Sequence, residues 1–315
     1  MMQTLRSALL LGPVLFWLAM MAAFIWASRS PDPSPPIAAE GLRDLWQFYL
    51  PLMLFTLATV FYFTRNRTKP TWQGFGVARH SIKQDLALAL AYLIAGHLIL
   101  GSLFNVGLHF PGPEVFAPGV HNRQGVLWWA GLQATVFVVL PYFWLRRRGF
   151  DLKKLVKGID WKRDIWLMIA FWGGEFFTVA FISDFFDVAP ADYSYAIPFG
   201  ILANTVGAGL PVLVMIHLII LPRLSLLLDN QLLVIMLGGL VYATFSLFDP
   251  GTSYATATNG WVSVSYIFLT QTLIGMGKAA FTVRTGNPFI HFTSYHILGA
   301  RVAFDTSMYA DIFRR

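Results

Sequence analysis

Long apolar runs separated by short polar segments dominate this chain of 315 residues. A helix rises 1.5 Å per residue, so about 20 apolar residues cover the roughly 30 Å hydrocarbon core of a bilayer. We predict a transmembrane helix for each of eight runs near this length, which are residues 7–27, 46–64, 86–105, 127–145, 165–186, 197–221, 231–248 and 261–283.

A ninth run, residues 288–304, is shorter and carries His291, His296 and Arg301. Its polar content leaves three alternatives open: a full span, a re-entrant segment or a helix packed inside the bundle. The first run is interpreted as a retained anchor, because about 20 apolar residues exceed the roughly 7–15 of a secretory signal core.

These elements predict an all-α fold, a polytopic integral membrane helix bundle of eight or nine transmembrane helices. Residues 1–126 form a predicted N-terminal region of three spans with proline-rich outer loops. Residues 127–315 form a predicted helical membrane core.

Composition excludes several other classes of protein. Charged residues make up only 12% of the chain, against about 25% in soluble domains, while 56% of the residues are hydrophobic and the mean hydropathy is +0.59. An ordinary soluble globule, a coiled coil, a disordered tail and a nucleic-acid binder are therefore excluded. The chain has no cysteine, so it has no disulfide, no thiolate nucleophile and no Cys-ligated zinc.

The net charge of +7 reflects loop residues that set orientation in the membrane. With the N-terminus inside, 17 of the 23 Lys and Arg residues fall in inner segments and three, Arg29, Arg43 and Arg123, fall in outer loops. This asymmetry predicts a cytoplasmic N-terminus.

A weak internal repeat relates residues 74–94 to residues 149–178. Both begin with a Gly-Phe pair, pass a basic segment that ends in Asp85 or Asp164, and enter an apolar span. The pattern is consistent with two similar entry helices or with a duplication.

Glu175 is the main candidate for chemistry. It lies ten residues beyond Ile165, near the middle of its predicted span, and follows Gly173 and Gly174. Placing a carboxylate at that depth in the membrane raises the free energy of insertion by at least about 2.5 kcal/mol. Two interpretations follow: a general base or ligand-orienting carboxylate, or a protonated structural Glu that is hydrogen-bonded to a neighbouring helix.

The other polar candidates carry weaker signals. Asp249 lies at an outer span end, where water makes a carboxylate inexpensive, whereas His97 and His217 lie inside spans. His291 and His296 are five residues apart, which does not place them on one helix face, so we expect no two-histidine metal site there. Lys278 is expected to snorkel to the inner interface.

The second half of the chain, residues 127–303, resembles the CPBP (Abi) family, the bacterial relatives of the CAAX prenyl endopeptidase. The resemblance rests on the order of four features, which are a basic entry at 146–164, the exit Leu221-Pro222-Arg223-Leu224, the Phe245-to-Asp249 segment, and a Gly-rich span that ends in Arg284-Thr285-Gly286 before His296. It implies a bacterial cytoplasmic (inner) membrane location.

Most of the catalytic residues of this family are replaced in this chain. Pro211 and Val212 stand at the paired-glutamate positions, Ile216 at the arginine, Asp249 at the second-motif histidine and Ala300 at the last asparagine. His296 alone matches.

Loss of these residues favours a CPBP-like protein that works by binding. It would be a scaffold, assembly or regulatory subunit that contacts other integral membrane proteins within the lipid bilayer. Two alternatives stay open. One is an active intramembrane protease with a remodelled site of Glu175, Asp249 and His296, and the other is a cofactor- or pigment-binding subunit in which His97 or His217 ligates a metal centre. The sequence identifies no cofactor.

Overall fold

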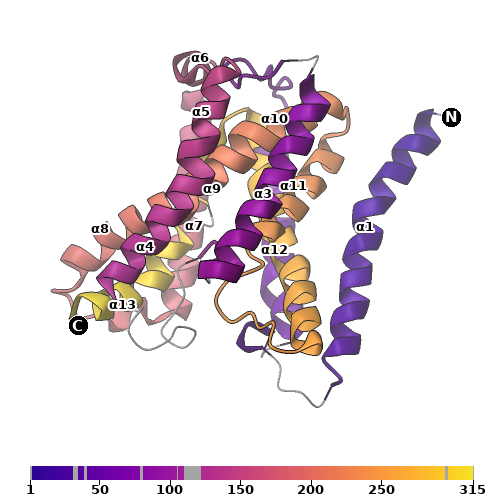
Figure 1. Ribbon diagram of the computed structural model, residues 1–315. Coiled ribbons are helices and arrows are strands. Elements are labelled where there is room, and N and C mark those ends of the chain that lie inside the picture. The colour runs from indigo at the N-terminus through magenta and orange to yellow at the C-terminus, as the bar shows by residue number, and fades with distance from the viewer. Residues whose placement is uncertain are drawn as a thin grey trace.

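The computed structural model describes residues 2–30, 35–38, 41–78, 81–104, 106–109, 122–294 and 297–314. Within these ranges the chain is all-helical and contains no β-strand (Figure 1). The α-helices are α1 (Met2–Ala27), α2 (Leu50–Thr64), α3 (Ile82–Phe104), α4 (Arg123–Ala134), α5 (Leu140–Arg147), α6 (Leu152–Lys157), α7 (Trp161–Ile182), α8 (Tyr193–Asn204), α9 (Leu210–Val212), α10 (Leu221–Leu227), α11 (Gln231–Phe245), α12 (Ala257–Thr285) and α13 (Ala300–Arg314). The 3-10 and π turns are η1 (Pro36–Ala38), η2 (Leu45–Tyr49), η4 (Thr135–Val139), η5 (Asp184–Asp187), η6 (Thr205–Gly209), η7 (Leu213–Ile220) and η8 (Pro288–Phe292).

Five continuous helices in the described residues are long and apolar enough to cross a membrane. They are Leu45–Thr64, Ile82–Phe104, Arg123–Arg147, Trp161–Ile182 and Tyr193–Leu227. Two shorter apolar helices, Leu11–Ala27 and Gln231–Phe245, also fall on predicted spans. The helical class is therefore confirmed, and the count of eight or nine spans stays a prediction.

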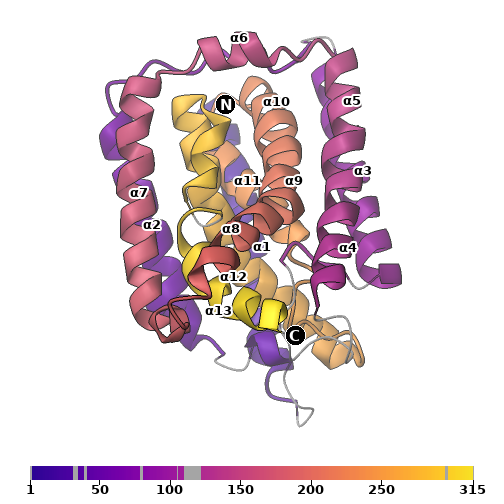
Figure 2. The same cartoon turned by 90° about the vertical axis from the view of Figure 1, so that its left-hand side faces the viewer.

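The helix from Tyr193 to Leu227 forms the centre of the bundle. It runs for 35 residues, and 78% of its apolar window is buried, against 22–39% for the other four candidates. Pro198 lies inside α8 and Pro211 is the second residue of α9, and the π turns η6 and η7 keep the helix continuous around the backbone bonds that proline removes. In Figure 2, α7 and α2 flank this helix on one side and α3 and α5 on the other.

Residues 288–304 do not form a single helix, so a full span is wrong for this segment. The chain makes the short turn η8, leaves helical geometry, and enters α13 at Ala300. Asn287 explains the break: its side-chain oxygen accepts from the Phe289 backbone N–H at 2.9 Å, while Gly286 ends α12 in a left-handed conformation.

Two segments cross the same end of the bundle in opposite directions and replace what would be simple loops. One joins α2 to α3, and the other joins α5 to α7 and contains α6. They meet where Phe75 pairs with Phe150 in an isolated antiparallel bridge, and the Asp151 backbone N–H donates to the Gly74 carbonyl at 2.9 Å. Gly74 has a positive φ of 85°, and a Cβ there would lie 2.6 Å from the Leu155 nitrogen, so only glycine fits.

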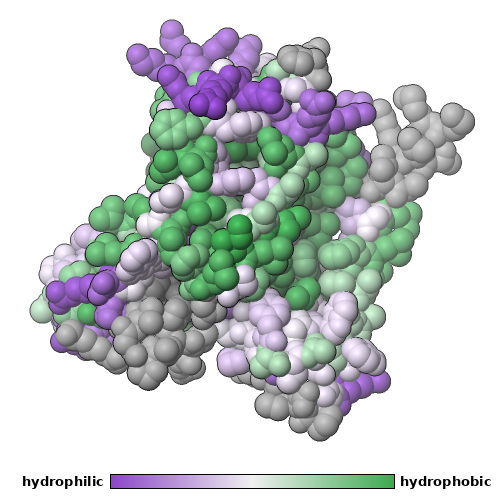
Figure 3. Space-filling model, in the orientation of Figure 1, coloured by the Kyte–Doolittle hydropathy of each residue, from purple (hydrophilic) through white to green (hydrophobic). Residues whose placement is uncertain are grey.

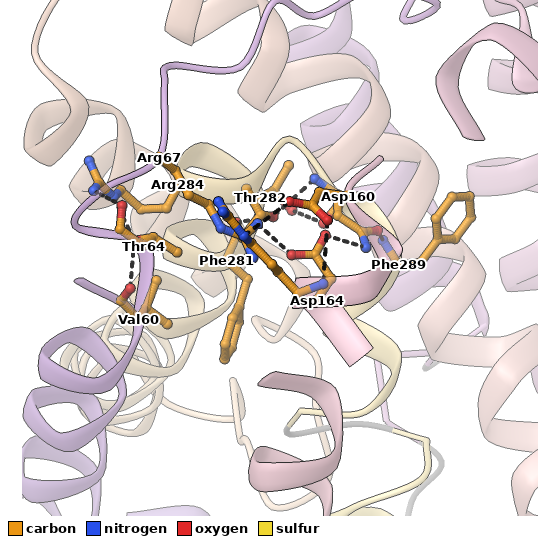
Figure 4. Close-up of polar contacts among 12 residues, drawn as sticks. Val60, Thr64, Arg67, Asp160, Asp164, Phe281, Thr282, Arg284 and Phe289 are labelled. Carbon is orange, nitrogen blue, oxygen red and sulfur yellow. Dashed lines mark hydrogen bonds and ion pairs between the residues drawn. The ribbon is translucent and has the colours of Figure 1, made fainter. Parts of the chain in front are cut away.

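The two entry aspartates of the internal repeat occupy equivalent positions, the fourth residue of α3 and of α7, and both are buried. Asp164 pairs with Arg67 from the other crossing segment at 2.5 Å and accepts from the Asn287 amide at 3.0 Å (Figure 4). Asp85 pairs in turn with Arg148, which precedes the second crossing segment, at 2.8 Å. Each ion pair thus joins a residue of the N-terminal region of three predicted spans to a residue of the predicted helical membrane core, and each region supplies the aspartate of one pair and the arginine of the other.

The hydropathy of the surface follows this arrangement. Hydrophilic residues gather at the end that carries α6, and a broad apolar belt covers the helices below it (Figure 3). Such a belt bounded by a basic end is typical of a protein in a bilayer.

Removing the Asp164 carboxylate tests the reciprocal ion pairs. Because Arg67 is only 10% exposed, Asp164→Ala leaves a nearly buried guanidinium without its counter-ion, and we expect the free energy of unfolding to fall by about 3 kcal/mol. Asp164→Asn keeps an acceptor and is expected to cost less. Denaturant unfolding in detergent, followed by tryptophan fluorescence, measures both.

The matched control is Asp311→Ala, which removes an exposed ion pair with Arg314 and is expected to change stability by less than about 1 kcal/mol. Equal losses at Asp164 and Asp311 would contradict a structural role for the crossing segments.

Candidate binding and catalytic site

Asp249 lies just beyond α11, at the end of the bundle opposite α6. Its two carboxylate oxygens accept from the backbone N–H of His109 at 2.9 Å and contact His109 Nδ1 at 2.6 Å. Burial lowers the pKa of His109, while Asp249 opposes that shift. A neutral imidazole can donate its Nδ1 hydrogen to the Asp249 carboxyl group in this geometry.

This pair lines a polar cavity of about 460 Å³ together with residues of α11, α12 and α13. Arg301 lines the same cavity and contacts Asp305 at 3.1 Å, while the Asn204 amide donates to the other Asp305 oxygen at 2.9 Å. Gln271 and Tyr242 add an amide and a phenol to its wall. The cavity is therefore rich in hydrogen-bonding groups of both signs.

Glu175 lines a different and largely apolar space. A groove of about 240 Å³ runs between α2 and α7, with Phe55 and Phe171 on its walls and Glu175 nearly buried within it. A Cβ on Gly299 would lie 3.0 Å from a Glu175 carboxylate oxygen, so the segment before α13 packs closely against this side chain. Phe48 and Ala300 line both the groove and the polar cavity, which makes the two spaces neighbours.

Lys278 does not reach the membrane interface, so the expectation of snorkelling is wrong. Its side chain is buried, its ammonium donates to the Ser294 carbonyl at 3.4 Å, and the nitrogen lies 5.3 Å from the centre of the Tyr242 ring. It also interacts electrostatically with Glu175. These contacts hold the Lys278 amine inside the bundle.

The candidate histidines occupy two separate sites. His97 of α3 stacks on Phe137 at 4.5 Å and meets the edge of Phe245, so its surroundings are aromatic. His217, in the central helix, contacts the Thr282 hydroxyl through Nδ1 at 2.6 Å and stacks on His291 at 4.5 Å. Among the described residues, no group of three or more His, Cys, Asp or Glu side chains is arranged to hold a metal ion.

His296 lies outside the described residues. A remodelled protease site requires Glu175 and His296 to lie close together, and the described residues do not include this distance. The structure does place Glu175 and Asp249 on different cavities.

The positions that resemble the family motif are apolar and internal. Pro211, Val212 and Ile216 are all buried in the central helix, and the next polar side chain along the helix is His217. No carboxylate from this part of the helix is available to activate water.

Three residues of these sites escaped the sequence analysis as candidates: His109, Arg301 and Lys278. His109 sits in a loop with no helical period, and its partner Asp249 is 140 residues away. The usable signal was position in the sequence, because Arg301 and Lys278 both lie in apolar runs, where a charge requires a partner.

Comparisons with protein-family models, with curated proteins and with solved structures found no match to this chain.

The pKa of His109 predicts an acid-sensitive fold. The unfolded chain binds a proton near the ordinary value of 6.5, whereas the folded chain binds it only at lower pH. Stability from this group is therefore complete above pH 6.5 and is lost as pH falls below it. We expect the thermal unfolding midpoint to decrease as the pH is lowered from about 7.5 to about 5.5, and to decrease less in His109→Gln.

The variant keeps the buried histidines His97, His217 and His291, so the difference between the two pH curves isolates His109. Parallel curves would show that its protonation is not linked to folding.

Proposed function

We propose that the chain is a CPBP-like polytopic protein of the bacterial inner membrane that acts by binding other membrane proteins, without peptide hydrolysis. The observation that carries this proposal is the apolar character of Val212 and Ile216, which are almost fully buried at motif positions where the family needs charged groups. The separation of Glu175 from Asp249 supports binding over a remodelled hydrolase, because catalytic groups must converge on one reacting atom.

The outer face of α7 is a suitable surface for a partner helix. Trp166, Ile169, Phe177 and Phe181 are exposed, and Gly173 lies among them at the same helical spacing. Nothing lies within 4 Å of a Cβ built on Gly173, so this position forms a hollow between large side chains. Small residues between bulky ones let transmembrane helices approach closely. The proposed partner is therefore the transmembrane helix of another membrane protein.

The orientation proposed here has the N-terminus and the α6 end in the cytoplasm, as the positive-inside asymmetry of the loops indicates.

Filling the hollow tests this function. We expect Gly173→Leu to reduce recovery of membrane-protein partners about tenfold in a mild-detergent pull-down quantified by mass spectrometry, because the added side chain blocks helix approach.

The matched control is Gly131→Leu on α4, where a Cβ also has nothing within 4 Å. Both substitutions raise helix propensity equally. A partner set that is unchanged by Gly173→Leu, or lost equally in both variants, would refute docking on α7.

A further inference from the structure

We infer that the polar cavity and the adjoining groove between α2 and α7 bind one amphiphile, a phospholipid with a zwitterionic head that carries a phosphate and a primary ammonium. Its head would lie in the cavity beside Arg301 and Asp249, and an acyl chain would lie in the groove. This site is separate from the outer face of α7, so it goes beyond the proposed function and does not depend on it.

Arg301 provides the group that recognises a phosphate. Its side chain is 27% exposed and lines the cavity, and within the described residues it forms an ion pair with Asp305 through one of its nitrogens. The remaining N–H groups of the guanidinium fork match the geometry of phosphate oxygens. Arg301 also lies in the first turn of α13, and the positive end of a helix dipole favours an anion.

The charges that remain in the cavity favour an ammonium as well. Arg301 and Asp305 neutralise each other, and Asp249 receives its two contacts from a histidine whose lowered pKa keeps it neutral. The described lining therefore holds two carboxyl groups, Asp249 and Asp305, and one guanidinium, Arg301. A purely anionic head would bring no positive group to Asp249, whereas a zwitterionic head can place its phosphate beside Arg301 and its ammonium beside Asp249.

The groove provides a mostly apolar surface, in which Glu175 is the one carboxyl group among the described lining residues. Leu52 and Phe55 of α2 face Ala170, Phe171 and Gly174 of α7 across a space of about 240 Å³. The space is open because Gly174 has no side chain, and a Cβ there would meet nothing within 4 Å. Since Phe48 and Ala300 line both spaces, the head and the chain of one molecule reach them together.

The two adjacent glycines of α7 separate this site from partner docking. Gly174 lines the groove, whereas Gly173 does not. A leucine at position 174 would occupy the acyl-chain space and leave the outer face of the helix unchanged, and a leucine at position 173 would do the reverse.

Native mass spectrometry of the purified full-length chain, delipidated in detergent and titrated with phosphatidylethanolamine or phosphatidylglycerol, tests the inference. We expect one retained phosphatidylethanolamine per chain, with at least about fivefold preference over phosphatidylglycerol. Gly174→Leu and Arg301→Gln should each weaken retention about tenfold, while Gly173→Leu and Gly131→Leu should not change it.

Arg301→Lys separates the guanidinium fork from its charge and is expected to lie between wild type and Arg301→Gln. The thermal unfolding midpoint of each variant is measured in the same detergent, and retention is compared among variants that melt within a few degrees of wild type. A Cβ at position 174 meets nothing within 4 Å, so Gly174→Leu keeps the test valid if the Arg301 variants unfold.

Three results would overturn the inference. They are equal retention of the two lipids, undiminished retention in Gly174→Leu, and full competition by soluble glycerophosphoethanolamine, which would mean that the acyl chain contributes nothing. Loss of partners in Gly173→Leu with lipid retention unchanged would leave both proposals standing, because each glycine reports on one of them.

Discussion

The Arg223 guanidinium is fully buried at one end of the central helix, where removal from water costs several kcal/mol unless other groups replace the lost hydration. Four groups do so. Arg223 lies 3.5 Å from Asp85, donates to the carbonyls of Gly76 and Ile219 at 3.1 and 2.9 Å, and stacks over the Trp144 ring at 4.9 Å. These partners belong to α3, the first crossing segment, the central helix itself and α5, so one charge fixes their relative positions.

The same end of the bundle is closed from the other side by Asp164. Asp164 joins α7 to the segment that leaves α2, and Asp85 joins α3 to the end of α5. Ion pairs of buried aspartates with arginines therefore hold the α6 end together. The cavities, by contrast, lie between α2, α7 and α13 and around the loop after α11, where the packing leaves room for a ligand.

The sequence predicted apolar helices correctly because hydropathy is a local property, while the number of spans stays a prediction. The predicted run 86–105 falls on α3, and the predicted run 197–221 falls within the central helix. It left residues 288–304 open between three alternatives, because Asn287 and Gly286 impose a turn there that average hydropathy does not register. It failed at Lys278, because the groups that hold its ammonium, Ser294 and Tyr242, come from other parts of the chain.

The candidate sites were harder to predict for the same reason. Glu175 and Asp249 were recognisable as polar residues in apolar or boundary positions. The cavity that each of them lines is set by contacts between distant parts of the chain. Examples of such contacts are His109 with Asp249 and Arg67 with Asp164, which are 140 and 97 residues apart in the sequence. Nothing in the local pattern fixes contacts at such distances, and the internal repeat indicated only that Asp85 and Asp164 were comparable.

Incubation of the purified chain with a prenylated peptide and with a transmembrane peptide, followed by mass analysis of the peptides, tests most directly whether this protein binds without hydrolysis. Both peptides should remain intact over hours, because the central helix offers no carboxylate at the motif positions. Cleavage that proceeds in the wild type and stops in Glu175→Gln would contradict this, and would show that Glu175 acts as a catalytic base.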